Sequence, residues 1–231
     1  MLKSFWRLCF RLLYNELAFT YDIISRLISL GHWGSWQRCV LPYLPAPNTG
    51  VILELAHGTG DLQIDLLREG YKTVALDLSP YMGQLAQRKL RHANLNAYLV
   101  RGDALRLPYR SNAIAAAVCT FPTPFIFCQH VLDELARVLQ PSGRIVVVLV
   151  GQLRGRGLCR QLIRQLYRLS GQRDALLSES AVFELFSTSH FHVKNHVVTI
   201  GSTAAQVAVL TAVPRLNLPQ PDVSLDFAHL S

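Results

Sequence analysis

The alternation of apolar runs with helix-like stretches between residues 51 and 150 constrains the fold of this chain more than any other feature. Helix-like stretches occur near 62–69, 81–91 and 130–139. Between them lie five runs with the length and composition of buried strands: Val51–Leu55, Thr73–Leu78, Ala97–Val100, Ala113–Cys119 and Arg144–Val150. Such alternation predicts βαβ units, and therefore a parallel sheet with helices on both faces.

The segments on either side of this region have a different character. Residues 1–46 have helical periodicity, and a stretch rich in proline and other turn residues separates them from the first strand-like run. After residue 150 we expect a helical insertion over 152–190, followed by two β-rich runs, His192–Ile200 and Ala204–Val213. Gly201 and the two residues after it suit a hairpin between these runs, so the last pair should be antiparallel.

The expected architecture is therefore an α/β fold. We expect a doubly wound sheet of seven strands, mostly parallel with an antiparallel C-terminal hairpin strand, and an N-terminal helical cap. The α/β core should occupy residues 47–213 and a tail should occupy 214–231, all within one domain over 1–231. Half of the 231 residues are hydrophobic and 16% are charged, which is a globular composition with enough length for a sizeable core.

Composition also bears on compartment and partner. No uninterrupted apolar run approaches the ~18 to 20 residues that cross a bilayer. Arg7 and Arg11 interrupt the apolar N-terminus and no small-residue cleavage site follows, so no signal peptide is expected. The five cysteines are dispersed without a CxxC pair, as a reduced cytoplasm permits, and no metal site is expected. The net charge of +8 favours an acidic partner, either nucleic acid or anionic lipid.

The strongest motif is the stretch Leu53–Leu62, LELAHGTGDL, in which a strand runs into a glycine turn. Gly58 and Gly60 supply the G-x-G of a dinucleotide fingerprint, but Gln63 stands where its third glycine should be. An NAD-dependent enzyme is therefore the weaker interpretation. Asp77 lies 17 residues after Gly60, at the end of the second strand-like run, where an acid can hold the ribose hydroxyls of either NAD or S-adenosylmethionine.

Four segments in register resemble the class I S-adenosylmethionine-dependent methyltransferases. They are Glu54–Gly60 for motif I, Asp77–Met82 for the second motif, Val100–Pro108 for the third, and Glu134–Arg144 for the run into the fifth strand. The N-terminal segment Tyr14–Asp22, with Trp36–Arg38 after it, is similar to the ubiquinone/menaquinone C-methyltransferase (methyltransferase type 11) branch. Two departures are that Phe-Pro-Thr-Pro replaces the branch's Arg-Asn-Val after strand four, and that residues 150–231 show no clear match.

The resemblance implies a Rossmann-like fold and S-adenosylmethionine as cofactor, with S-adenosylhomocysteine as product. It implies these cofactor-binding positions: Tyr21, Glu54, Ala56, Gly58, Gly60, Asp77, Leu78, Met82, Asp103, Ala104 and Thr120. By resemblance, Gly58 and Gly60 let the backbone approach the methionyl part, Asp77 takes the ribose hydroxyls, and Leu78 and Met82 cover adenine. Asp103 and the Ala104 amide would bind the adenine edge, Glu54 would attract the amino group, and Tyr21 would reach the carboxylate.

The substrate side is expected at the end of the fourth strand, where Phe121 and Pro122 form a stiff, apolar wall. The sequence there lacks the Asn-Pro-Pro-Tyr-type signature of enzymes that methylate base amino groups, which points away from nucleic acid as substrate. His57 could titrate near neutral pH and act as a base, but it more often packs, so no catalytic residue is assigned.

Two basic stripes leave the surface partner open. Arg156, Arg160, Arg164 and Arg168 recur every four residues on an expected helix over 158–169, and Lys3, Arg7 and Arg11 do so at the N-terminus. They are either a solvated face, a peripheral contact with anionic membrane, or a phosphate-binding surface for RNA.

The sequence thus predicts a methyltransferase for a small, lipophilic acceptor, cytoplasmic and acting at a membrane surface. The alternatives are an RNA methyltransferase, a non-catalytic methyltransferase-like binding module and an NAD-dependent reductase. The methyl acceptor and the oligomeric state are not determined by the sequence.

Overall fold

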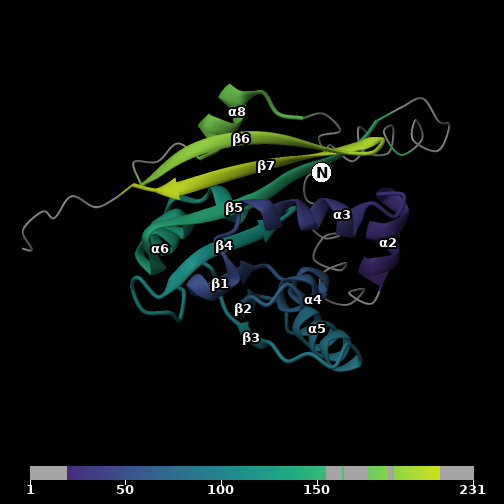
Figure 1. Cartoon of the computed structure of the whole chain (residues 1–231), viewed down its shortest axis with the longest axis horizontal. Coiled ribbons are helices and arrows are strands. Elements are labelled where there is room, and N and C mark those ends of the chain that lie inside the picture. The colour runs from purple at the N-terminus through teal and green to yellow at the C-terminus, as the bar shows by residue number, and fades with distance from the viewer. Residues whose placement is uncertain (1–19, 155–162, 164–175, 187–189, 214–231) are drawn as a thin grey trace, which may run out of the picture.

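The computed structural model describes residues 20–154, 163, 176–186 and 190–213, and shows one seven-stranded sheet (Figure 1). The strand order is β3-β2-β1-β4-β5-β7-β6. β1 to β5 pair in parallel, whereas β7 is antiparallel to both β5 and β6. The strands are β1 Val51–Leu55, β2 Lys72–Asp77, β3 Tyr98–Arg101, β4 Ile114–Thr120, β5 Leu139–Leu153, β6 Phe191–Ile200 and β7 Thr203–Ala212. The predicted fold class is confirmed, with the antiparallel hairpin at one edge.

The helices cover both faces of the sheet. The α-helices are α2 Tyr21–Ile28, α3 Trp33–Gln37, α4 Asp61–Arg68, α5 Pro80–His92, α6 Gln129–Val138 and α8 Glu179–Leu185. The 3₁₀ helices are η2 Arg38–Tyr43, η3 Pro47–Thr49 and η4 Pro124–Phe127. One hydrophobic cluster joins the sheet to α6 and α8, and a second joins it to α3, η2 and α4. The central strands are buried on both faces, which explains why β4 reads as an uninterrupted apolar run.

Several boundaries differ from the sequence prediction. β5 begins at Leu139 and ends at Leu153, well beyond the predicted Arg144–Val150, because β7 pairs with it as far as Thr203 opposite Leu153. Within the predicted N-terminal helical segment, α2 ends at Ile28, and the short helices α3 and η2 follow it. The N-terminal stripe, the basic helix over 158–169 apart from Ile163, and the tail over 214–231 lie outside the described residues.

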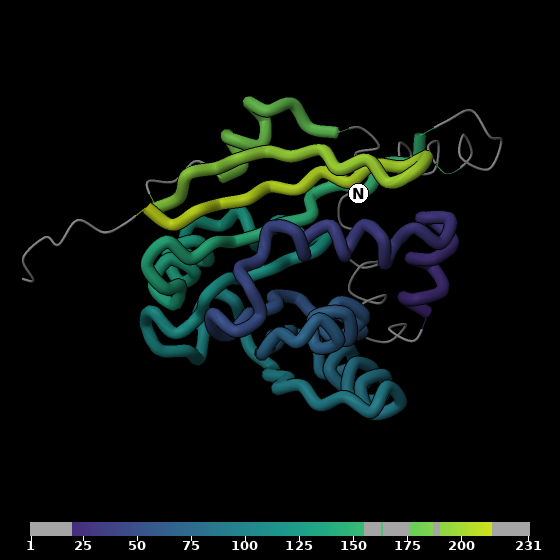
Figure 2. Tube along the Cα trace, viewed as in Figure 1, coloured from purple at the N-terminus to yellow at the C-terminus, as the bar shows by residue number. Residues whose placement is uncertain are grey.

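The segment from α2 to η2 crosses the molecule between the hairpin and the α4–α5 pair (Figure 2). Trp36 attaches this segment to the sheet: its indole is 1% exposed and its Nε1 donates to Thr203 Oγ1 at 3.1 Å. A Cβ at Gly151 would lie 2.2 Å from Trp36 Cε3, so only glycine leaves room for the indole against β5. This packing brings the end of α3 to the carboxyl ends of the central strands. No helix in the described part of the chain is long and apolar enough to span a bilayer.

Candidate functional site

The candidate site is the loop that follows β1, held by the acid at the end of β2. Ala56, Gly58 and Gly60 have φ angles of 53°, 54° and 84°, so the chain turns sharply through left-handed conformations before α4 begins. The Gly58 N–H donates to Asp77 Oδ2 at 2.9 Å, and the Ser79 N–H donates to Asp77 Oδ1 at 2.8 Å. Each carboxylate oxygen keeps a free lone pair, so Asp77 can shape the loop and still accept hydroxyl groups from a ligand.

The two glycines of this loop are required for different reasons. A Cβ built on Gly58 meets nothing within 4 Å, so the space beside this residue is left open. A Cβ on Gly60 would lie 2.9 Å from the Cβ of Ala86, so Gly60 lets α5 pack closely against the start of α4. The sequence interpretation gave both glycines to the cofactor. The structure shows a packing role for Gly60, and a cofactor contact of either glycine stays a prediction.

Beneath the loop, Glu54 belongs to a buried polar network. Gln63 Nε2 donates to Glu54 Oε2 at 2.6 Å, and Thr73 Oγ1 donates to Gln63 Oε1 at 2.7 Å. Glu54 is 1% exposed, and burial raises its pKa from 4.5 to about 8 against the lowering effect of the Gln63 hydrogen bond. Gln63 therefore fills the place of a dinucleotide glycine and joins β1, α4 and β2.

His57 packs in the loop. It is buried, and its Nδ1 lies 2.8 Å from the carbonyl oxygen of Gly58, which suits the tautomer in which Nδ1–H donates. Burial lowers the pKa of the imidazole, while the nearby Asp77 carboxylate opposes that shift. The neutral imidazole, hydrogen-bonded to its own loop, therefore helps to hold that loop in its conformation.

A cluster around Lys89 fastens the N-terminal cap to this loop. Lys89 Nζ contacts Asp22 Oδ2 at 2.6 Å, Asp61 Oδ1 at 2.7 Å and Thr59 Oγ1 at 2.8 Å. Thr59 Oγ1 also donates to Asp22 Oδ1 at 2.6 Å. We call these four residues the Lys89 cluster. It joins α2, the glycine loop, α4 and α5, and the sequence gave no signal for it, because its members lie up to 67 positions apart.

A small cavity lies between the cap and the glycine loop. Its volume is about 20 Å³, and its lining residues are Tyr21, Trp33, Gln37, Ala56, His57, Gly58, Thr59, Asp61 and Thr120. Four of the predicted cofactor residues therefore meet here: Tyr21, Ala56, Gly58 and Thr120. The volume is about that of a single water site, so a larger ligand needs the cap to move outward.

Aromatic rings pack together beside this cavity. Tyr21 and Trp33 line it and meet edge-to-face at 6.1 Å, and the ring centroids of Trp33 and Phe121 are 4.2 Å apart. Phe121 has a φ of 51°, a left-handed conformation that a bulky residue adopts only where its surroundings hold it. Pro122 follows it, half-buried. Phe121 thus joins an aromatic cluster, and its role with Pro122 in lining a substrate stays a prediction.

The residues predicted around adenine lie outside this cavity. Leu78 is exposed, whereas Met82 is fully buried on the inner face of α5. Asp103 is exposed and its Oδ1 accepts from the Leu105 N–H at 3.0 Å, while Ala104 is buried. The positions follow β2 and β3, on the same edge of the sheet as the glycine loop.

Comparison with known proteins agrees with this geometry. Residues 52–143 match the family described as "Methyltransferase domain". Over these residues the chain resembles a methyltransferase domain. The demethylmenaquinone methyltransferase of Thermus thermophilus is 36% identical over 140 residues, which cover 59% of this chain and 63% of that protein. The ubiquinone/menaquinone biosynthesis C-methyltransferase UbiE of Ruegeria sp. is 32% identical over 152 residues, covering 63% and 60%.

Solved structures show the same fold. A geranyl diphosphate methyltransferase in complex with SAM superimposes with a TM-score of 0.60 at 15% identity, covering 82% of this chain and 90% of that one. A SAM-dependent methyltransferase from Aquifex aeolicus gives 0.56 at 18% identity, covering 77% and 89%. The resemblance to class I methyltransferases and to their ubiquinone/menaquinone branch is confirmed. The matches cover less than two thirds of the length of the curated relatives.

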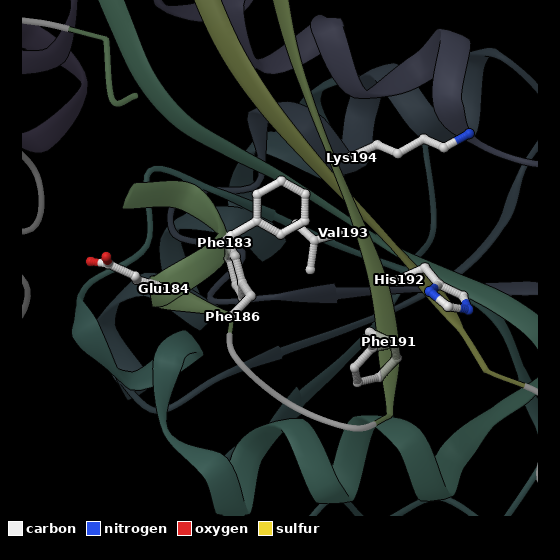
Figure 3. Close-up of a pocket in the computed structure, with 7 residues that line it drawn as sticks. All are labelled: Phe183, Glu184, Phe186, Phe191, His192, Val193 and Lys194. Carbon is white, nitrogen blue, oxygen red and sulfur yellow. The ribbon is translucent and has the colours of Figure 1, made fainter. Parts of the chain in front are cut away.

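A larger groove lies between α8 and β6, with a volume of about 630 Å³ (Figure 3). Phe183, Phe186 and Val193 point toward one another, whereas Lys194 points away on the other side of the strand. His192, near the start of β6, pairs with Thr211 of β7, and Thr211 pairs in turn with Arg144 of β5. Arg144 lies at the opposite end of β5 from the cap. The groove is thus remote from the carboxyl ends of the parallel strands.

Proposed function

We propose that the chain transfers a methyl group from S-adenosylmethionine to a small, lipophilic acceptor. The observation that carries this proposal is the loop from Ala56 to Gly60, turned over the carboxyl end of β1 and tied to Asp77. Ligands of open α/β sheets bind at this edge. The curated relatives from Thermus thermophilus and Deinococcus radiodurans are demethylmenaquinone methyltransferases, which supports the same activity.

The residues of the site fit such a cofactor. The space beside Gly58 is one that a Cβ would enter without meeting protein, and the Asp77 carboxylate keeps acceptor capacity for two hydroxyl groups. When bound, the cofactor supplies a methyl group already activated on a sulfonium, so that orientation of the acceptor is the main task left to the protein. We propose that Asp77 holds the ribose, that the backbone at Gly58 flanks the methionyl part, and that Tyr21 and Thr120 flank it from the cap and β4.

The aromatic cluster supports a lipophilic, planar acceptor. Trp33 lines the cavity with its ring 4.2 Å from that of Phe121, and Trp36 meets Phe121 at 6.1 Å. Such rings offer flat apolar surface and exclude water from the reacting atoms. Few charged groups line the cavity, and Asp61 among them is paired with Lys89. An apolar ring system is therefore a better match than a polyanionic nucleic acid.

We further propose that α2 meets a membrane surface. Its polarity is inverted: Ser25 and Ser29 are buried, while Ile23 and Leu27 are 60% and 66% exposed. Leu30, which is 40% exposed, adds to the same exposed apolar set. An exposed apolar helix face of this kind favours contact with lipid, and it would bring the site close to a membrane-dissolved acceptor.

Sedimentation with anionic phospholipid vesicles tests the membrane contact. The variant Leu27→Ser should bind vesicles several-fold more weakly than the wild type, because exposed apolar area is lost. Tyr98→Ser, at an exposed position on the edge strand β3, is the matched control and should bind like the wild type. Equal sedimentation of all three proteins would contradict the proposed contact.

Transfer of labelled methyl tests the activity itself. Wild-type protein with methyl-labelled S-adenosylmethionine and a prenylated naphthohydroquinone should yield label in the organic extract, and Asp77→Ala should yield none above background. Total RNA, tested in parallel, should remain unlabelled. Label in RNA alone would favour the RNA methyltransferase alternative, and binding of the cofactor without transfer to either acceptor class would contradict the proposed substrate.

A further inference from the structure

Gln37, the last residue of α3, has a buried amide of which only one end is bonded. Its side chain is 8% exposed and lines the cavity between the cap and the glycine loop. Nε2 donates to Thr120 Oγ1 at 3.2 Å, whereas no donor among the described residues pairs with Oε1. A buried acceptor without a partner destabilises the folded protein, because it has lost its hydrogen bonds to water, unless a ligand supplies the missing donor.

The chemistry around Gln37 favours a hydrogen-bond donor from a ligand. Asp61 and the neutral, buried His57 line the same cavity, and the charge of Asp61 is already paired with Lys89. An amide oxygen only accepts hydrogen bonds, so a carboxylate ligand facing Oε1 would place acceptors against each other. The ligand group that belongs here therefore carries N–H or O–H, and an ammonium group, which only donates, meets this requirement.

On this basis we propose that Gln37 binds the α-ammonium group of the methionyl end of S-adenosylmethionine through its Oε1, with Thr120 orienting the amide. This rests on the proposed function, in which Asp77 takes the ribose and leaves the ammonium as the cationic donor of that cofactor. Gln37 is thus a cofactor-binding residue that fixes the methionyl end against the cap. The position was not among the predicted cofactor residues.

Calorimetric titration with three nucleosides tests the proposal. S-adenosylhomocysteine carries the ammonium, its deamino analogue lacks only that group, and 5′-deoxy-5′-methylthioadenosine lacks the whole amino acid. Wild-type protein should bind the deamino analogue about 10-fold more weakly than S-adenosylhomocysteine, a difference of about 1.4 kcal/mol for one charge-assisted hydrogen bond. In Gln37→Leu this difference should disappear, and the affinity for methylthioadenosine should equal that of the wild type.

Thermal unfolding without ligand gives a second readout with the opposite sign. Because Gln37→Leu removes an unpaired buried acceptor, its midpoint should equal or exceed that of the wild type while its affinity for S-adenosylhomocysteine falls. Gln37→Glu keeps an acceptor oxygen facing the cavity, and Thr120 can turn its hydroxyl to donate, so this variant should restore the discrimination against the deamino analogue. Gln37→Met, which keeps the chain length without an acceptor, replaces the leucine variant if that protein does not fold.

The outcomes separate this proposal from the one on which it rests. If wild-type protein binds none of the three nucleosides, the proposed function and this inference both fail. If the wild type binds them but Gln37→Leu weakens all three equally, or leaves the tenfold discrimination intact, the inference about Gln37 fails and the proposed function stands. Loss of discrimination with unchanged methylthioadenosine binding supports it.

Discussion

Two hollows in the described part of the chain, the cavity under the cap and the groove between α8 and β6, differ in almost every respect. The groove is about 630 Å³ and lined mainly by phenylalanine and valine, whereas the cavity is about 20 Å³. Yet the small cavity has left-handed Ala56 and Phe121 beside it, a buried unpaired amide oxygen, and Asp77 bonded to its loop. A strained backbone or an unpaired buried polar group persists only where other interactions compensate for its cost. These features therefore mark a ligand site better than the volume of a hollow does.

The largest effect expected on the cavity side is the loss of ligand binding in Asp77→Ala. Asp77 accepts from the Gly58 and Ser79 amides, and we propose that it also accepts the ribose hydroxyls. Its removal should weaken binding of S-adenosylhomocysteine about 100-fold, or about 2.7 kcal/mol, measured by calorimetry. Phe183→Ala, in the groove, is the control and should bind like the wild type. If the groove variant lost affinity instead, the comparison of the two regions would be reversed.

The pH dependence of stability tests the buried acid of the cavity side. Burial raises the pKa of Glu54 from 4.5 to about 8, so between these values the folded protein retains a proton that the unfolded chain has released. The free energy of unfolding should therefore fall with rising pH in this window, by up to roughly 1 kcal/mol per pH unit. Glu54→Gln removes this contribution. If the free energies of unfolding of the wild type and of Glu54→Gln changed equally with pH between pH 5 and 8, that result would contradict the raised pKa.

The two glycines of the loop should separate stability from binding. Gly60→Ala places a Cβ 2.9 Å from that of Ala86 at a φ of 84°, and should cost about 2 kcal/mol of unfolding free energy. Gly58→Ala at a φ of 54° meets only open space and should cost about 1 kcal/mol. Gly58→Ala should nevertheless be the variant that binds S-adenosylhomocysteine at least 10-fold more weakly. Equal losses of affinity in the two variants, once each is shown to be folded, would refute the separate roles.

The smallest effect is expected at the Lys89 cluster. Lys89→Met keeps most of the aliphatic stem but removes the contacts to Asp22, Asp61 and Thr59, so unfolding should become easier by about 1 kcal/mol. High salt should narrow the difference from the wild type, because the pairs are partly exposed. Arg38→Met, which removes a single exposed pair with Asp65, is the control and should change stability less. An equal loss of unfolding free energy in both variants would show that the Lys89 cluster stabilises the fold no more than a single surface ion pair does.

Much of the fold followed from the sequence because its signals are local. The apolar runs, the G-T-G turn and the acid after β2 each lie within a few residues, and parallel topology then brings Ala56, Gly58 and Thr120 to one edge. What could not be predicted depends on distances between elements. The role of Gly60 depends on how closely α5 approaches, and Gln63 could be read only as the absence of a glycine, not as the partner of Glu54 and Thr73.

The cap was the least predictable part of the site. Gln37 lies at the end of a five-residue helix that is too short to show a helical period. Its Oε1 is buried without a partner because Trp36 holds this helix against the sheet, and that packing has no local sequence signal. Likewise, the ion pair between Asp22 and Lys89 joins α2 to α5, which are far apart in the sequence. Such contacts carry no local signature, and they decide how the cap closes the cavity.

A crystal structure of the protein with S-adenosylhomocysteine would test the central claim most directly. The account predicts the nucleoside at the carboxyl ends of the parallel strands, with its ribose hydroxyls on Asp77, its methionyl end beside Gly58, and the cap displaced from the glycine loop. A nucleoside bound between α8 and β6, or one bound elsewhere with Asp77 contacting only its own backbone partners, would contradict it.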